Sequence, residues 1–176
     1  MRATKGHKDL IDAIVPLMAS RPKLHLVFVG GGSPVFEQTQ DYVATLGLQD
    51  RIHLMGMRRD VPNLLAGFDV FALATQQEAS GTVYVEAQAS GLPVIGTDVG
   101  GVSEMFRNGE TGILVPPKNP QALTEALQRL IDDPALRRRM GDAGRKMVWE
   151  EAVFSPARLA ETTEAVYWKW LAERAG

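Results

Sequence analysis

The 176-residue chain contains no cysteine, and this absence excludes disulfide frameworks, thiolate zinc sites and cysteine nucleophiles. It has three histidines, and no two of them stand three or four residues apart, the spacing at which a helix presents a pair to a metal. No apolar run approaches the roughly 18 residues of a membrane span. The polar, basic start of the chain leads into no apolar signal-peptide core. We therefore expect a protein of the cytoplasm, or of the inner face of the cytoplasmic membrane, that requires no metal.

An excess of charge of one sign is also lacking, because 19 basic residues face 21 acidic ones and the formal net charge is −2. A dedicated nucleic-acid-binding protein usually carries a strong positive excess, so we expect no nucleic-acid partner. Hydrophobic residues make up 45% of the chain and charged residues 23%, which is typical of a globular protein. We expect one domain, residues 1–176, large enough to bury roughly 70% of its unfolded surface.

Short apolar runs alternate with segments of helical periodicity along the chain. Strands are predicted over 24–29, 51–55, 69–73, 93–96 and 112–115. Helices are predicted over 10–18, 34–47, 60–66, 82–89, 102–107, 120–131, 134–150 and 156–172. The alternation predicts an α/β fold: a Rossmann-like, doubly wound parallel sheet with helices on both faces, around which the final helices also pack. Such a domain normally opens with a strand, whereas this chain opens at the loop before a helix, so we expect a first strand to be absent.

Ligands of open parallel sheets bind beyond the carboxyl ends of the strands, and four segments of this chain are predicted there. They are Gly30–Ser33, Gly56–Arg59, Ala74–Gly81 and Thr97–Gly101. The first segment lacks the last glycine of the dinucleotide fingerprint Gly-x-Gly-x-x-Gly, which argues against NAD. The chain also has neither a P-loop sequence nor the Gly-x-Ser-x-Gly elbow of α/β hydrolases.

The segment from Glu78 to Glu86 is the most informative one, because it places two carboxylates around a predicted helix start at Gly81. The free N–H groups of Gly81, Thr82 and Val83 would point into the cleft and form an anion site that the helix dipole supports. The two carboxylates repel phosphate but accept hydrogen bonds from hydroxyls. A ligand with hydroxyls on both sides of a diphosphate fits this arrangement, and a nucleotide sugar is such a ligand.

Short glycine-containing motifs and the glutamate pair follow one another in a fixed order between residues 5 and 115. They are Lys5-Gly6-His7, Val29–Gly32, Ile52–Gly56, Ala66–Val70, Glu78–Ala87, Gly91–Ile95, Gly100–Glu104 and Gly109–Val115. Each motif is weak alone. As an ordered set they resemble the C-terminal, donor-binding half of retaining GT-B glycosyltransferases, specifically glycosyltransferase family 4.

The resemblance implies a role for each candidate residue. Glu78 would hold hydroxyls of the donor sugar, and Glu86 would accept both ribose hydroxyls. Lys5 and an arginine would bind the leaving diphosphate. Arg2 is the arginine nearest to Lys5 in the sequence, and the alternative is an arginine ahead of Met1. The resemblance also implies that Gly81, Thr82 and Val83 at the helix start bind the donor, and that Met57 and Arg58 lie beside the base. Ser80 would form part of the wall of the sugar pocket, at a position where the family often has an aromatic residue. Gly31 is a further donor-binding candidate, and the alternative is that its glycine-rich turn is purely structural.

The resemblance also implies an enzyme that transfers a hexose or N-acetylhexosamine, with retention, from a nucleotide diphosphate sugar to a bacterial surface polysaccharide or lipopolysaccharide. UDP is the expected nucleotide, and no cofactor or metal is expected. The saccharide or lipid-linked acceptor would bind an N-terminal domain that we expect to be absent here, so the chain alone would transfer little. Two alternatives stay open: a GT-B sugar-nucleotide epimerase or phosphorylase, and a non-catalytic binding module with an apolar surface around Trp168 and Trp170.

Overall fold

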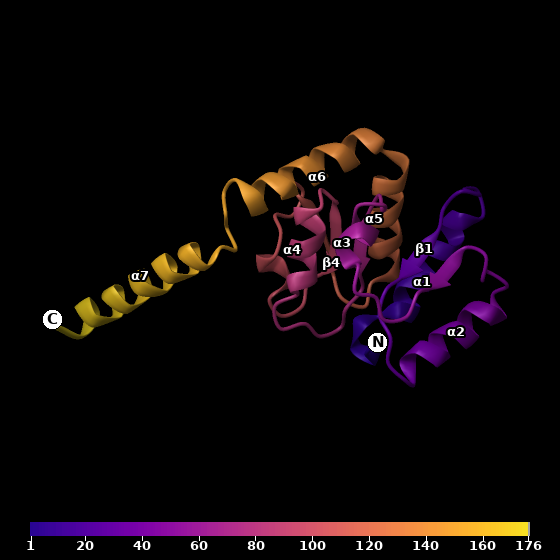
Figure 1. Cartoon of the computed structure of the whole chain (residues 1–176), viewed down its shortest axis with the longest axis horizontal. Coiled ribbons are helices and arrows are strands. Elements are labelled where there is room, and N and C mark those ends of the chain that lie inside the picture. Colours follow the sequence, from indigo (N-terminus) through magenta and orange to yellow (C-terminus); the bar gives the residue numbers. More distant parts are fainter. Residues whose placement is uncertain (176) are drawn as a thin grey trace.

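Five short parallel strands form the centre of the computed structural model, which describes residues 1–175 (Figure 1). Strand β1 (Leu26–Phe28) pairs with β2 (Ile52–Leu54), with Leu26 opposite Ile52. Strands β3 (Phe71–Leu73), β4 (Val94–Thr97) and β5 (Gly112–Val115) form a second group in that order, with Val94 opposite both Phe71 and Gly112. All pairings between these strands are parallel, as the alternation of apolar runs predicts.

Helices alternate with these strands. They are α1 (His7–Met18), α2 (Val35–Thr45), α3 (Val61–Leu65), α4 (Thr82–Ala89), α5 (Pro120–Asp132), α6 (Pro134–Trp149) and α7 (Pro156–Ala175), with 3-10 turns at Ala3–Lys5 (η1) and Val102–Glu104 (η2). The α-helix predicted over 102–107 is therefore wrong. Only the turn η2 forms there, because the chain reverses at Gly109, whose φ is +80°, in order to enter β5.

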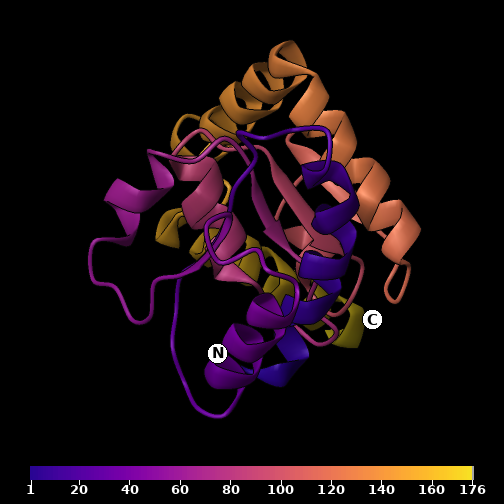
Figure 2. The ribbon, with the colours of Figure 1, turned by 90° about the vertical axis from the view of Figure 1, so that its right-hand side faces the viewer.

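Two apolar clusters cover the two faces of the sheet. The first joins α1 and α5 and includes Ile11 and Leu127, and the second includes Leu65 of α3 and Tyr84 of α4. Strand β4 serves both clusters, because Ile95 belongs to the first and its neighbour Val94 to the second. Figure 2 shows α1 and α5 on one side of the strands and α3 and α4 on the other. The doubly wound architecture is confirmed.

Helix α7 departs from the prediction that the final helices pack around the sheet. It projects away from the body of the molecule (Figure 1), and Leu159, Val166 and Trp168 are each about two-thirds exposed, at 68%, 67% and 64%. Both faces of the sheet are already covered before α7 begins, and its apolar residues do not gather on one narrow stripe. Across residues 1–175, we find no helix whose length and hydropathy would let it cross a membrane.

Helix α6 packs on the body through a glycine. A Cβ atom placed on Gly141 would lie 2.0 Å from the carbonyl oxygen of Gly91, the second residue after α4. The side of α6 that carries Leu136 and Met140 is buried against the core. The absence of a side chain at Gly141 thus sets how closely α6 approaches α4 and the start of β4.

Replacing Gly141 with alanine is expected to lower the free energy of unfolding by about 1–3 kcal/mol, because a backbone oxygen occupies the space of the new methyl group. A loss of stability would identify the steric contact, because alanine ordinarily stabilises a helix interior by about 1 kcal/mol relative to glycine. Urea denaturation measures the effect, with Arg138→Ala on the exposed side of the same helix as control. A Gly141→Ala protein as stable as the control would contradict the close packing.

Candidate functional site

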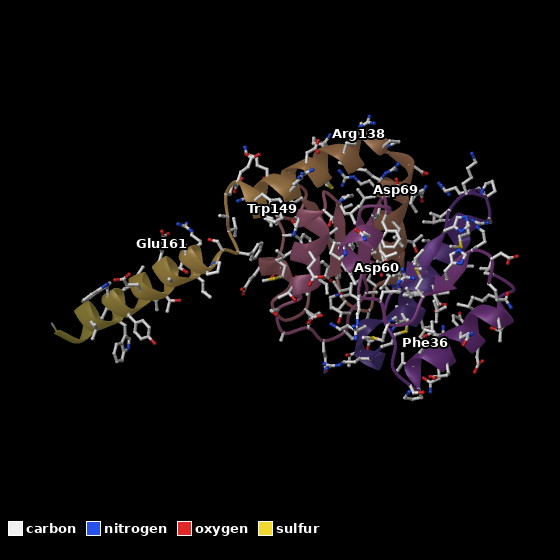
Figure 3. All side chains as sticks on the ribbon, in the orientation of Figure 1. Phe36, Asp60, Asp69, Arg138, Trp149 and Glu161 are labelled. Atoms are coloured by element: carbon white, nitrogen blue, oxygen red, sulfur yellow. The ribbon has the colours of Figure 1, made fainter. Side chains whose placement is uncertain are left out.

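The loops that follow the strands meet at the carboxyl edge of the sheet. Two residues labelled in Figure 3 mark the two edges of the sheet. Asp60 lies in the loop after β2, at the carboxyl edge, whereas Asp69 lies just before β3, at the opposite edge. The sequence-predicted segments after β1, β2, β3 and β4 therefore share one edge, together with the N-terminal segment that precedes α1.

Lys5 and Glu78, which are distant in sequence, form an ion pair through the Lys5 ammonium and Glu78 Oε2. The side chain of Glu78 is 13% exposed and that of Lys5 is 28% exposed, so the pair sits in a partly desolvated position. The interaction joins the N-terminal segment to the loop after β3. Two residues that the sequence assigns to the donor thus lie in direct contact.

Two glycines make this contact possible. Gly6 has φ +64°, and a Cβ atom on it would lie 1.8 Å from the carbonyl oxygen of Ala74 at the end of β3. Gly100 has φ +54°, and its Cβ would lie 1.8 Å from the carbonyl oxygen of Glu78. A side chain at either position would collide with backbone, which cannot swing aside as a long side chain can. The two loops therefore hold Lys5 and Glu78 through main-chain packing.

The start of α4 presents free hydrogen-bond donors to the same edge. Gly81 adopts the left-handed conformation with φ +69° and precedes the helix without a side-chain cap. Within residues 1–175, the N–H groups of Gly81, Thr82 and Val83 donate to no protein acceptor. Tyr84 anchors this turn, because its fully buried ring packs beneath Gly81. The turn at which the sequence predicts an anion site therefore carries unpaired donors, and anion binding there stays a prediction.

The second carboxylate lies a helical turn further along α4. Glu86 is exposed to solvent, whereas Ala87 and Gln88 beside it are buried. Ser80 and Thr82 are exposed at the helix start. Glu86 is therefore free to accept hydrogen bonds from a ligand, and Glu78 and Glu86 flank the free N–H groups as the sequence predicts.

The glycine loop after β1 packs on the loop after β2. The N–H of Gly30 donates to the carbonyl of Gly56 over 2.8 Å, and a Cβ on Gly31 would lie 3.2 Å from Met57 Cγ. Met57 itself is 81% exposed. Arg58 is held by Asp60 through two hydrogen bonds of 2.8 and 2.6 Å, and this contact lowers the pKa of the Asp60 carboxyl. The guanidinium of Arg58 is thus already paired.

One cavity, with a volume of about 1430 Å³, connects several of the candidates. It is lined by Arg2, Lys5, Gly31, Val83 and Glu86, and it continues between β1 and β3. Glu78 does not line the cavity itself but forms an ion pair with Lys5, which does. The exposed residues Ser80, Met57 and Arg58 lie in the loops of this edge and Thr82 begins α4, but none of the four lines the cavity.

His7 is a further polar residue that lines this cavity. Its Nδ1 is buried and has no hydrogen-bond partner among the described residues, and its ring packs edge-on against Phe28 at 5.4 Å. Burial lowers the pKa of His7, and the positive charges of the N-terminus and Lys5 lower it further. In the sequence, only the position of His7 directly after Lys5 and Gly6 indicates that it lies beside the candidate site.

Metal-binding groups do not gather in the part of the chain that the structure describes, where no three histidine or acidic side chains could hold one ion. Independence from metal stays a prediction. The candidate site offers two cations, Lys5 and Arg2, two carboxylates and a set of free N–H groups. This combination suits an anionic ligand that also carries hydroxyls.

Comparisons with known proteins identify the family. Residues 1–147 match the family described as glycosyl transferases group 1. N-acetyl-alpha-D-glucosaminyl L-malate synthase of Bacillus anthracis is 31% identical over 167 residues, which is 95% of this chain and 43% of that protein. The chain thus spans less than half the length of this relative.

Two solved structures are similar as well. The C-terminal domain of a glycosyl transferase group 1 family protein (LpcC) of Francisella tularensis is 28% identical with a TM-score of 0.76, over 84% of this chain and 80% of that one. Anabaena Alr3699/HepE in complex with UDP-glucose is 27% identical with a TM-score of 0.80, over 94% of this chain and 46% of that one. The chain belongs to the group 1 glycosyl transferases, and its extent corresponds to a C-terminal domain of that family.

Proposed function

We propose that this chain is the donor-binding half of a retaining GT-B glycosyltransferase of family 4 and that it binds a nucleotide diphosphate sugar. The observation that carries the proposal is the row of free N–H groups at the start of α4, flanked by Glu78 and Glu86. The similar structure of Alr3699/HepE holds UDP-glucose, which supports UDP as the nucleotide. We further propose that the acceptor is a surface polysaccharide or lipopolysaccharide and that it binds a second domain.

The diphosphate would lie over the start of α4. The N–H groups of Gly81, Thr82 and Val83 have no protein acceptor within residues 1–175, which supports their role as donors to the phosphates. Lys5 would turn its ammonium from Glu78 to the phosphates, and Arg2 at the same cavity supplies a second positive charge. Two cations and a helix start together stabilise the charge that grows on the leaving diphosphate.

Hydroxyl groups of the ligand would bind the carboxylates. Glu86 would accept from both ribose hydroxyls, and each bond to a charged acceptor contributes about 1.5–3 kcal/mol. Glu78 would accept from hydroxyls of the donor sugar once Lys5 moves to the phosphates. Ser80 would form part of the sugar pocket, whereas Gly31 and Met57 would bound the base pocket. Arg58 is the weakest candidate, because Asp60 already holds it.

The transfer itself exchanges one bond at the anomeric carbon. The bond to the diphosphate oxygen breaks and a bond to the acceptor oxygen forms, and the leaving phosphate takes the acceptor proton. The residues of this chain contribute positioning and electrostatic stabilisation to that step. Acceptor binding requires surface outside this domain, so the chain alone is expected to bind donor without transfer.

The Glu86→Ala variant is expected to bind both UDP and uridine about ten- to a hundredfold more weakly, because both ligands carry the ribose whose hydroxyls Glu86 accepts. Isothermal titration calorimetry measures the two dissociation constants. Glu125→Ala on α5 is the matched control, since Glu125 is also an exposed helical glutamate. Loss of folding in Glu86→Ala, or unchanged affinity for both ligands, would rule out the ribose assignment.

The Lys5→Met variant is expected to weaken UDP binding by about tenfold and to leave uridine binding unchanged, because only UDP carries the charge that Lys5 meets. Lys5→Arg, which keeps the charge, should retain most of the affinity. The UDP affinity of the unmodified chain should also fall more steeply with salt than that of Lys5→Met. Equal losses for UDP and uridine would mean that Lys5 only supports the fold around Glu78.

A further inference from the structure

Two buried threonines stand at the carboxyl ends of neighbouring strands. Thr97 is the last residue of β4, and Thr75 follows the end of β3 by two residues. Burying a hydroxyl group costs free energy unless the hydroxyl forms hydrogen bonds. Neither threonine lines the cavity of the candidate site. Their contribution to this edge of the sheet therefore comes from the hydrogen bonds that they form inside the protein.

The hydroxyl of Thr75 reaches two main-chain carbonyls. Its oxygen lies 2.9 Å from the carbonyl oxygen of Gln77 and 3.1 Å from that of Thr4. Because a threonine hydroxyl has a single hydrogen to donate, the two carbonyls share it. The Gln77 carbonyl belongs to the peptide bond that leads to Glu78, and the Thr4 carbonyl belongs to the bond that leads to Lys5. One buried hydroxyl thus contacts the main chain beside each member of the ion pair.

Thr97 fixes Thr75 to the best-supported strand of the sheet. The Thr97 hydroxyl donates a hydrogen bond to the carbonyl oxygen of Thr75. All four residues of β4 are buried, and β4 has a strand neighbour on each side. The end of β3 is therefore held by β4, and the position of the Thr75 hydroxyl is set by the centre of the fold.

Other contacts hold the N-terminal segment against the end of β3. The N–H of Gln76 donates to the Thr4 carbonyl over 2.7 Å, and the side-chain amide of Gln76 donates to Asp9 Oδ2 over 3.0 Å. These bonds fix the segment that carries Lys5, but they do not reach the peptide bond beside Glu78. The hydroxyl of Thr75 joins the two.

We propose that Thr75 is a positioning residue of the donor site: its hydroxyl sets the place of Lys5 relative to Glu78, so that the ammonium can pass from Glu78 to the phosphates. The inference rests on the proposed function for the identity of the ligand, and on the hydrogen bonds for the geometry. Thr75 itself touches no ligand, because its side chain is fully buried and does not line the cavity. It acts through Lys5 and Glu78.

The test compares the removal of two buried hydroxyls. Thr75→Val keeps the shape of the side chain without its hydroxyl, and Thr75→Ser keeps the hydroxyl. Thr111→Val is the matched control: Thr111 is also fully buried, its hydroxyl accepts from the N–H of Arg107 over 3.0 Å, and it directly precedes β5, at the opposite edge. Calorimetric titration with UDP and with uridine, together with thermal unfolding, is carried out on each protein.

Thr75→Val is expected to bind UDP about three- to tenfold more weakly and uridine as before, because only UDP carries the charge that Lys5 meets. Both valine variants should lower Tm by about 3 °C. Thr111→Val and Thr75→Ser should bind UDP like the unmodified chain. In the Lys5→Met background, Thr75→Val should cause no further loss, because Thr75 acts through Lys5. Equal UDP affinities of the two valine variants, a further loss in the double variant, or no rescue by serine would overturn the proposal.

A measurement without ligand separates this proposal from the proposed function. The NMR signal of the Lys5 ammonium, assigned by its absence in Lys5→Met, reports the ion pair with Glu78. Thr75→Val should shift this signal more than Thr111→Val does, and Thr75→Ser should leave it in place. Thr97→Val, which releases the Thr75 carbonyl from β4, should shift it in the same direction and serves as the second variant if Thr75→Val does not fold.

An unchanged Lys5 signal in Thr75→Val or, where that variant does not fold, in Thr97→Val would overturn the positioning role. Absence of UDP and uridine binding to the unmodified chain would instead refute the proposed function. The Lys5 signal alone would then decide whether Thr75 positions Lys5.

Discussion

The common direction of the strands is the constraint on which the rest of this structure depends. Because all pairings between the five strands are parallel, the carboxyl ends of the strands lie at one edge, and each return to the opposite edge requires a crossover. The loops after β1, β2, β3 and β4 therefore meet although they are far apart in sequence. The candidate donor site exists because the helices return the chain to the same starting edge each time.

Close contact between backbones then determines the site geometry. Gly6 lies on Ala74 and Gly100 lies on Glu78 at distances that exclude any side chain. These contacts place Lys5 against Glu78 and hold the loop before α4, and the buried ring of Tyr84 supports the turn at Gly81 from below. A binding site built from main-chain packing needs little rearrangement when an anion arrives, which is the property that electrostatic stabilisation of a leaving group requires.

The candidate donor site opens into the cavity between β1 and β3, and Arg2 and Lys5 both line it. The two cations belong to the N-terminal segment, which the hydrogen bond from the N–H of Gln76 to the carbonyl of Thr4 ties to the end of β3. The loop after β3 therefore holds both Glu78 and the segment that carries its partner Lys5.

The sequence by itself determined the fold class, the order of the elements and the segments that form the site. Apolar periodicity indicates which face of a single helix or strand is buried, and the glutamate pair around Gly81 indicates a helix start with two flanking carboxylates. Both predictions need only residues that are close together in the sequence. Only the tertiary structure decided which residues pair across the fold: Lys5 with Glu78, Arg58 with Asp60, and no strand between β1 and β3 within residues 1–175. It also decided that α7 projects away from the sheet, where the sequence predicts packing. These outcomes depend on contacts between segments distant along the chain, which local patterns of burial and spacing do not contain.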